Sequence, residues 1–237
     1  MPAMPPSARP HRRPSALPAG LALALCLPAC HVQAAERYAL DPVHTRILFS
    51  VSHAGFSQAL GTISGSTGTL EFDPGDWSGA RLQVEVPLQR LDLGDARWNR
   101  ATLARNLLDG GRWPLARFVS QRVEPRGEQE FTVYGVLTLR GVSREVALEV
   151  RMNGLRRHPL PPFRRTAGFS ASTTLSRSAF GVDGWPSLIG DEVQVRIEAE
   201  AVRERGARPD DDADTGHEQI PSAATGTNPP LPESTDP

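Results

Sequence analysis

The most constraining feature of the sequence is an alternation of apolar and polar residues from Phe131 to Met152. In both halves of this stretch, apolar residues share one side: Phe131, Val133, Leu137 and Leu139, then Val146, Leu148, Val150 and Met152. A period of two is typical of a strand with one buried and one solvated face. Gly141, between the halves, suits a tight turn. The stretch therefore predicts a β-hairpin.

Most of the chain between residues 36 and 203 resembles this hairpin in pattern. Further strands are predicted at residues 45–53, 60–73, 80–87, 116–123, 166–175 and 192–202. Three glycines within 60–73 indicate bulges or sharp curvature, as a closing barrel needs. Residues 95–107 instead predict a short surface helix with Asp95 as its N-cap. About eight strands and one helical insert predict an all-β antiparallel barrel, with a sandwich as the alternative.

The two ends of the chain differ from this central region. Basic residues at 11–13, an apolar run at 21–27 and Val32-Gln33-Ala34 predict a signal peptide over residues 1–34. Export to the periplasm follows from that prediction. From residue 204 to 237 the sequence is acidic and rich in proline, so we predict a disordered tail. The barrel domain is expected at 36–203.

Two alternatives to ordinary export remain open. Leu27-Pro28-Ala29-Cys30 resembles a lipobox, in which Cys30 would carry a lipid anchor. Arg12-Arg13 offers a twin-arginine signal as a second alternative. Cleavage after Ala34 would remove Cys26 and Cys30, the two cysteines of the chain, and would exclude disulfides from the mature protein.

Five short motifs, in order along the chain, resemble those of the YceI-like proteins, a family of secreted bacterial polyisoprenoid-binding proteins. They comprise residues 38–53, 70–74, 114–120, 135–142 and 175–181, for example Leu70-Glu71-Phe72-Asp73-Pro74 and Leu137-Thr138-Leu139-x-Gly141-Val142. The resemblance implies an extended, lipocalin-like, eight-stranded antiparallel barrel. It also implies an apolar tunnel that holds an isoprenoid chain, such as a quinone tail or a prenyl phosphate.

One motif of the family is altered here. Where the family often carries Arg-Asp-x-His-Leu, this chain has Asn99-Arg100-Ala101-Thr102-Leu103, which keeps the leucine but lacks the aspartate and the histidine. A headgroup role for those two residues cannot be transferred to this chain. The identity of the headgroup therefore stays open.

The inward faces of the predicted strands mix large and small apolar residues, which leaves volume in a barrel of this size. An apolar chain in such a lumen would gain roughly 0.8 kcal/mol for each buried methylene. The residues predicted to line the tunnel are Ile47, Phe49, Val51, Leu82, Val84, Val86, Phe118, Phe131, Val133, Gly135, Leu137, Leu148, Val150, Phe169, Ala171 and Phe180. Gly135 is the smallest residue of its face, so Gly135→Phe is expected to fold and to exclude the ligand.

Four residues are headgroup candidates: His44, Arg46, Arg100 and Arg177. The arginines could bind a phosphate or a quinone oxygen; as the alternative, they are solvated on outward faces. His44 has a structural alternative, a hydrogen bond that fixes the turn after Asp41-Pro42. Trp98 and Trp185 are each expected to border a mouth or to serve as ordinary packing residues.

The sequence contains no hydrolase motif, no nucleotide-binding loop and no cluster of metal-binding residues. We therefore predict a binding protein without a catalytic cofactor. The net charge of −1 gives no reason to expect nucleic acid as a partner. Expected partners are the lipid and, transiently, a membrane, and a homodimer stays open. A protein-interaction or stress-response module with a filled barrel is the alternative function.

Overall fold

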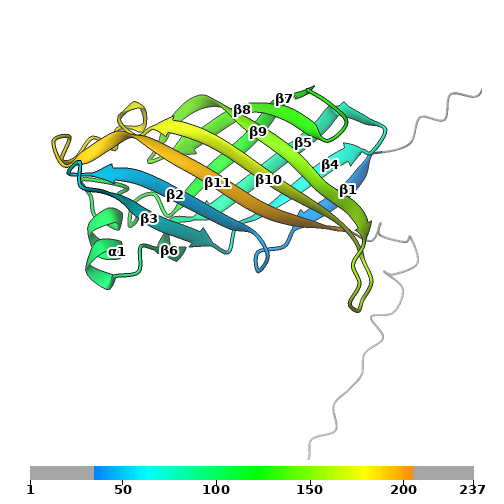
Figure 1. Ribbon diagram of the computed structural model, residues 1–237, viewed down its shortest axis with the longest axis horizontal. Helices are drawn as coiled ribbons and strands as arrows, with labels where there is room; N and C mark the ends of the chain where they lie inside the picture. Colours follow the sequence, from blue (N-terminus) through cyan, green and yellow to red (C-terminus); the bar gives the residue numbers. More distant parts are fainter. Residues whose placement is uncertain (1–34, 205–237) are drawn as a thin grey trace, which may run out of the picture. The chain divides into compact units, whose positions relative to one another are not determined.

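The computed structural model describes residues 35–204 (Figure 1). The predicted signal peptide, including Cys30, and the predicted tail beyond residue 204 lie outside the described residues. No helix within 35–204 is long and apolar enough to cross a bilayer.

Eight strands form a closed ring in which every neighbouring pair is antiparallel. In spatial order they are β1 (Glu36–Leu40), β4 (Thr67–Asp73), β5 (Asp76–Pro87), β7 (Leu115–Pro125), β8 (Glu130–Leu139), β9 (Val142–Arg157), β10 (Arg165–Ser176) and β11 (Ile189–Arg203). The ring closes where β1 pairs with β11. The predicted eight-stranded antiparallel barrel is confirmed.

The wall of the barrel is interrupted at two adjacent places. The turn at residues 41–45 separates β1 from β2 (Arg46–His53), and Gly65-Ser66 separates β3 (Ser57–Ser64) from β4. The long strand β11 spans the first interruption, because it pairs with β1 near its C-terminal end and with β2 nearer its N-terminal end. Gly65 has a φ of 76°, a conformation that glycine adopts without strain. The strand predicted at 60–73 is therefore two strands that meet at a kink.

The hairpin at the centre of the sequence pattern has the predicted form. Strands β8 and β9 pair from Glu130↔Arg151 to Leu139↔Val142 without a register shift. Arg140 and Gly141 connect them, both at positive φ, as a two-residue hairpin turn requires. Phe131, Val133, Val146 and Leu148 on the inward face are buried.

A helical insert follows the short elements η1 (Leu88–Arg90) and β6 (Leu91–Asp92). Helix α1 (Ala96–Leu103) begins where predicted, since the Asp95 carboxylate accepts hydrogen bonds from the backbone N–H groups of Arg97 (2.8 Å) and Trp98 (3.1 Å). It ends one turn earlier than predicted, and residues 104–114 continue as a loop. Strands β1 and β6 were absent from the sequence-based prediction because five and two residues are too few for a periodic pattern.

Candidate functional site

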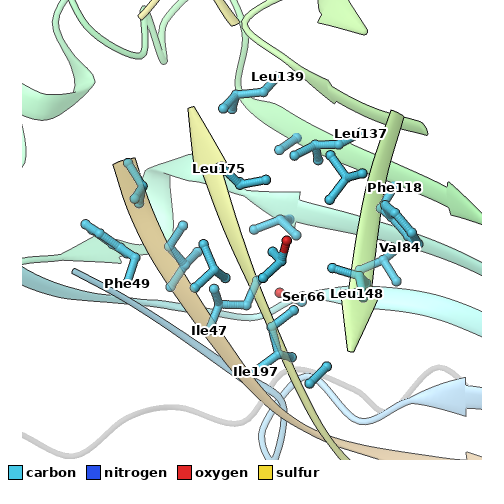
Figure 2. A pocket seen from close by; sticks show the side chains of 18 of the residues that line it. Ile47, Phe49, Ser66, Val84, Phe118, Leu137, Leu139, Leu148, Leu175 and Ile197 are labelled. Carbon is cyan, nitrogen blue, oxygen red and sulfur yellow. The ribbon is translucent and has the colours of Figure 1, made fainter. Parts of the chain in front are cut away.

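The barrel encloses an apolar cavity of about 510 Å³ (Figure 2). Strands from all sides of the barrel contribute to its wall, as Ile47, Val84, Phe118, Leu148 and Ile197 show in Figure 2. Every residue predicted to line the tunnel borders this cavity, except Gly135. A cavity of this size falls in the range of small-molecule sites.

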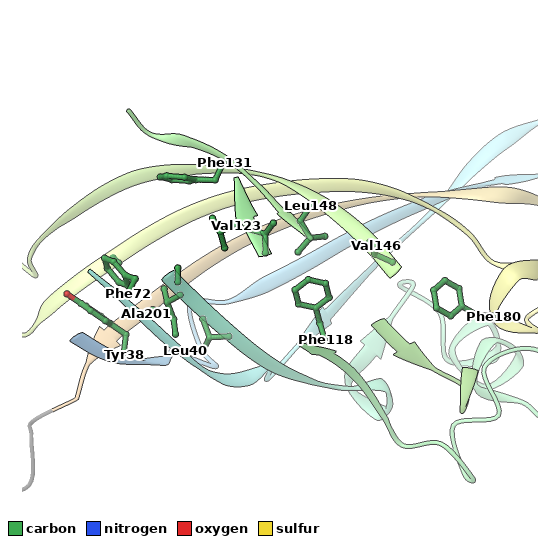
Figure 3. Packing of buried hydrophobic residues seen from close by; sticks show 14 of the residues in the cluster. Tyr38, Leu40, Phe72, Phe118, Val123, Phe131, Val146, Leu148, Phe180 and Ala201 are labelled. Atoms are coloured by element: carbon green, nitrogen blue, oxygen red, sulfur yellow. The ribbon is translucent and has the colours of Figure 1, made fainter. Parts of the chain in front are cut away.

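Stacked aromatic rings close the barrel at the end formed by β1 and β4. The ring centroids of Tyr38 and Phe72 are 4.9 Å apart, those of Phe72 and Trp77 4.3 Å, and those of Trp77 and Phe131 4.6 Å. Phe169 approaches Trp77 edge-on at 6.1 Å. Tyr38 and Phe72 have no exposed surface. We call these five residues the aromatic plug, and Figure 3 shows Tyr38, Phe72 and Phe131 at the end of the barrel opposite Phe180.

Tyr38 supports the plug through its polar end. Its hydroxyl donates to Oε2 of Glu36 at 2.6 Å. The other carboxylate oxygen of Glu36 accepts a hydrogen bond from Arg165 (3.2 Å) and forms an ion pair with Arg203 (3.1 Å). Burial, followed by this hydrogen bond, raises the pKa of Tyr38 well above its usual range. The plug is therefore fixed to the sheet at its rim.

Three segments meet at the opposite end of the barrel: the loop after α1, the β8–β9 turn and residues 177–189. Arg140 donates from Nη2 to the carbonyl of Arg105 (3.0 Å) and from Nη1 to the carbonyl of Gly181. Arg144 donates from Nε to the carbonyl of Ala179 (3.1 Å). Side chains of the hairpin thereby hold both loops at the barrel rim.

The rim of this end is apolar. Trp98, Phe180, Trp185 and Leu188 border the cavity; Phe180 is buried, and the other three are about half exposed. The β2–β3 turn lies beside them, because the N–H of Ala54 donates to the carbonyl of Leu188 at 2.6 Å. We call this end the mouth. It combines two tryptophans that border the cavity and are also partly exposed to solvent.

Among the headgroup candidates, Arg177 alone borders the cavity. It is 7% exposed. Its guanidinium donates to four backbone carbonyls of the mouth loop: Gly190 (2.8 Å), Ile189 (2.8 Å), Gly184 (2.9 Å) and Val182. No carboxylate pairs with it within the described part of the chain. Arg177 organises the loop that forms the mouth.

The other three headgroup candidates lie outside the cavity. Arg46 is exposed on β2, and Arg100 is exposed on α1. His44 lies in the exposed turn between β1 and β2, where its Nδ1 is 2.8 Å from Oδ2 of Asp41. The Asp41 carboxylate also accepts from the N–H groups of Val43 and His44, so this cluster fixes the turn.

The turn offers a direct pKa test. The hydrogen bond to Asp41, and then the charge of Asp41, raise the pKa of His44 above its ordinary value of 6.5. Stability from this pair is present below pH 6.5 and is lost as the pH rises through the higher folded-state pKa. NMR titration of the His44 ring should give a pKa above 6.5, and Asp41→Asn should lower it. A pKa at or below 6.5 in the wild-type protein would contradict the contact.

The prediction that Gly135 lines the tunnel and leaves space for the ligand is wrong. Gly135 lies on the predicted inward face and is buried, but a Cβ there would be 2.5 Å from both the Phe118 ring and the carbonyl oxygen of Val119. The Phe118 ring thus occupies the space that was assigned to the ligand. A backbone oxygen at this distance cannot move aside, so no side chain larger than hydrogen fits.

Gly135→Phe should consequently fail to fold rather than fold without ligand. Gly135→Ala should already lower the free energy of unfolding by about 2–3 kcal/mol, as overpacking of a core does. Chemical denaturation of the Ala variant measures this. If Gly135→Ala is as stable as wild type, β7 and β8 can move apart at this position.

Several residues of the cavity wall were missed. Thr45 extends the inward series Ile47, Phe49, Val51 backwards by one step, so strand alternation could have found it. Ser66 lies at the kink after Gly65, where alternation resets and gives no signal. Trp77 lies at the start of β5, before the first residue of the strand predicted at 80–87. His53, the last residue of β2, borders the cavity with its ring 5.1 Å from that of Trp98.

Comparison with known proteins agrees with this architecture. The sequence profile of the YceI-like domain matches residues 38–201. A UPF0312 protein of Pseudomonas syringae pv. syringae is 30% identical over 162 residues, which cover 68% of this chain and 83% of the relative. A UPF0312 protein of Shewanella baltica is 27% identical over 172 residues, covering 72% and 89%.

Solved structures share the fold. BcnA of Burkholderia cenocepacia superimposes with a TM-score of 0.61 at 23% identity, covering 68% of this chain and 98% of BcnA. A polyisoprenoid binding domain from Saccharophagus degradans, implicated in plant cell wall breakdown, gives a TM-score of 0.51 at 16% identity, covering 70% and 98%. The profile match over residues 38–201, together with the 30% identical relative, shows that this chain belongs to the family of YceI-like domain proteins.

Proposed function

We propose that this protein binds a polyisoprenoid lipid, of the quinone or prenyl-phosphate type, for transport, storage or stress response. The observation that carries the proposal is the apolar cavity of about 510 Å³ between the aromatic plug and the mouth. Each methylene that moves from water into it contributes roughly 0.8 kcal/mol, so a few isoprene units give appreciable affinity. The binding named for the Saccharophagus degradans domain supports the same ligand class.

The alternative module with a filled barrel is less well supported, because side chains leave this volume open. A binding role is also favoured over catalysis by the chemistry of the wall. Within residues 35–204, no aspartate or glutamate borders the cavity. A paired acid and base, which general acid–base catalysis requires, is therefore not provided there.

Titration of delipidated protein with geranylgeraniol tests the proposal, with intrinsic tryptophan fluorescence as the readout. Trp77 lies in the plug and Trp98 and Trp185 at the mouth, so a ligand in the cavity should change the emission saturably, at one ligand per barrel. A linear, non-saturating response at all concentrations would count against a binding cavity.

The mouth is proposed to contact a membrane during loading and release. Phe56, in the turn beside Leu188, is 93% exposed. Exposed aromatic residues around the entrance of a lipid site suit the bilayer interface. The lipid would then pass from the membrane into the cavity without crossing water.

Sedimentation with phospholipid vesicles tests this contact. The Phe56→Ser/Trp185→Ser variant is expected to bind vesicles at least tenfold more weakly, since each aromatic side chain contributes about 1–2 kcal/mol on burial. Leu160→Ser changes an apolar site whose exposure (64%) lies between those of Trp185 (51%) and Phe56 (93%), in the β9–β10 loop at the plug end; it is the control and should bind as wild type. Equal losses in both variants would contradict a docking role for the mouth.

We further propose that the mature protein acts in the periplasm after removal of residues 1–34. The basic residues and the apolar run of this segment support export. Determining the mature N-terminus by mass spectrometry tests it: a start at Ala35 supports a free periplasmic protein. A lipidated Cys30 at the N-terminus would establish the anchored alternative instead.

A further inference from the structure

Two hydroxyl groups in the cavity wall lack hydrogen-bond partners. Among residues 35–204, three buried side-chain polar atoms have no partner, and two of these are Oγ1 of Thr45 and Oγ of Ser66. Thr45 is 2% exposed and Ser66 is 0% exposed, and both border the cavity. Buried polar groups in folded proteins are nearly always hydrogen-bonded, so an unpartnered pair indicates a partner that the protein itself does not supply.

The two hydroxyls belong to the same place in the barrel. Thr45 immediately precedes Arg46, and Ser66 follows two residues after Ser64; Arg46 and Ser64 are paired at the end of the β2–β3 ladder. Both residues therefore lie where the wall is interrupted between β1 and β2 and between β3 and β4. Each of these two interruptions contributes one hydroxyl-bearing residue to the cavity wall.

The surroundings of these hydroxyls are apolar. Figure 2 shows Ser66 among the residues that line the cavity, together with Ile47 and Ile197. Leu40 and Leu70, on the strands that continue toward the aromatic plug, complete this part of the wall. The hydroxyls thus offer a small polar point inside a hydrophobic site, as ligand pockets commonly do to fix orientation.

The charges near the cavity constrain the ligand. The charged or titratable side chains that border it, within the described residues, are His53, Arg81 and Arg177. His53 and Arg177 belong to the mouth, and Arg81 is exposed on β5. A phosphate dianion beside Thr45 and Ser66 would lose its water without gaining a cation, which is costly. An uncharged oxygen needs only the two neutral donors.

We propose that Thr45 and Ser66 form a polar subsite that hydrogen-bonds an uncharged oxygen of the bound isoprenoid, a carbonyl or a hydroxyl. This subsite rests on the proposed lipid-binding function and narrows the ligand class to neutral isoprenoids such as quinones and prenols. Prenyl phosphates would place their headgroup elsewhere, outside this part of the cavity.

The test compares three ligands with the same C20 isoprenoid chain: geranylgeraniol, the hydrocarbon that lacks its hydroxyl, and geranylgeranyl phosphate. Dissociation constants are measured for wild type, for Thr45→Val/Ser66→Ala and for the control Thr67→Val, an exposed hydroxyl next to Ser66. The double variant should lose roughly 10- to 100-fold in affinity for geranylgeraniol, as two neutral hydrogen bonds predict. Its affinity for the hydrocarbon should change less than about threefold, and Thr67→Val should match wild type.

Thermal unfolding of the ligand-free proteins separates this role from a structural one. Because the hydroxyls have no partner in the protein, removing them should leave the midpoint unchanged or raise it. A clear drop would show that they stabilise the fold and would overturn the subsite.

Other outcomes are equally decisive. If the double variant loses as much affinity for the hydrocarbon as for geranylgeraniol, the subsite is overturned while lipid binding stands. If wild type binds the alcohol no more tightly than the hydrocarbon, the subsite is also overturned, and the two hydroxyls are assigned to bound water. If the double variant loses more affinity for geranylgeranyl phosphate than for geranylgeraniol, the restriction to neutral oxygens is overturned. If wild type binds none of the three ligands, the proposed function itself fails.

Discussion

An Ala171→Phe variant is expected to fold and to lose at least about 100-fold in isoprenoid affinity. Ala171 lies midway along β10, between Val150 of β9 and Ile197 of β11, and borders the cavity. A phenyl ring there enters open volume rather than a packed core. It displaces the equivalent of about four methylenes of ligand, or roughly 3 kcal/mol of binding free energy.

Ser172→Phe is the matched control for this variant. Ser172 is the next residue on the same strand and is exposed on the outer face. The control should bind isoprenoid as wild type, although it adds the same ring. If Ala171→Phe is stable and binds with wild-type affinity, the ligand does not occupy the middle of the cavity.

Replacing Arg177 by methionine should lower the free energy of unfolding by about 3–5 kcal/mol, since a fully buried carbonyl left without its donor costs about 1–3 kcal/mol and the partly buried ones cost less. The midpoint of thermal unfolding should fall by about 10 °C for a folded unit of this size. The carbonyls concerned are those of Val182, Gly184, Ile189 and Gly190, all in the loop that forms the mouth.

Arg144→Met provides the comparison, because Arg144 gives one hydrogen bond, to the carbonyl of Ala179, from an exposed position. Its effect should stay below about 1 kcal/mol. The prediction is contradicted if Arg177→Met keeps the wild-type midpoint of thermal unfolding but no longer prefers a ligand with a headgroup over one without. That result would show that Arg177 contacts the headgroup.

The barrel could be predicted from sequence because its long strands repeat every second residue. The hairpin from Phe131 to Met152 is the clearest case: its apolar positions are the inward ones, and its turn lies at Gly141. Alternation reports which face of a strand a residue occupies. For this reason, all the residues that alternation predicted to line the tunnel, except Gly135, border the cavity.

Alternation does not report how inward side chains share the interior. Gly135 was assigned to the ligand because it is small, yet the Phe118 ring covers it. Phe131 and Phe169 appeared to be ordinary wall residues, but they belong to the aromatic plug. These contacts join strands that are distant in sequence, and one chain without its fold contains no signal for them.

Polar residues were the least predictable part of the site. Arginine at a strand end is compatible with solvent, a headgroup or a backbone carbonyl, and only the loop around Arg177 distinguishes these cases. Ser66 lies at a kink, where the pattern of alternation restarts. Its position in the wall depends on the break between β3 and β4.

The most direct test of the lipid-binding account is organic extraction and mass spectrometry of protein purified from its native host. The account predicts one isoprenoid species in near-stoichiometric amount with wild-type protein, and its loss from Ala171→Phe purified in the same way. Wild-type protein that repeatedly contains no isoprenoid, or contains as much as Ala171→Phe, would contradict it.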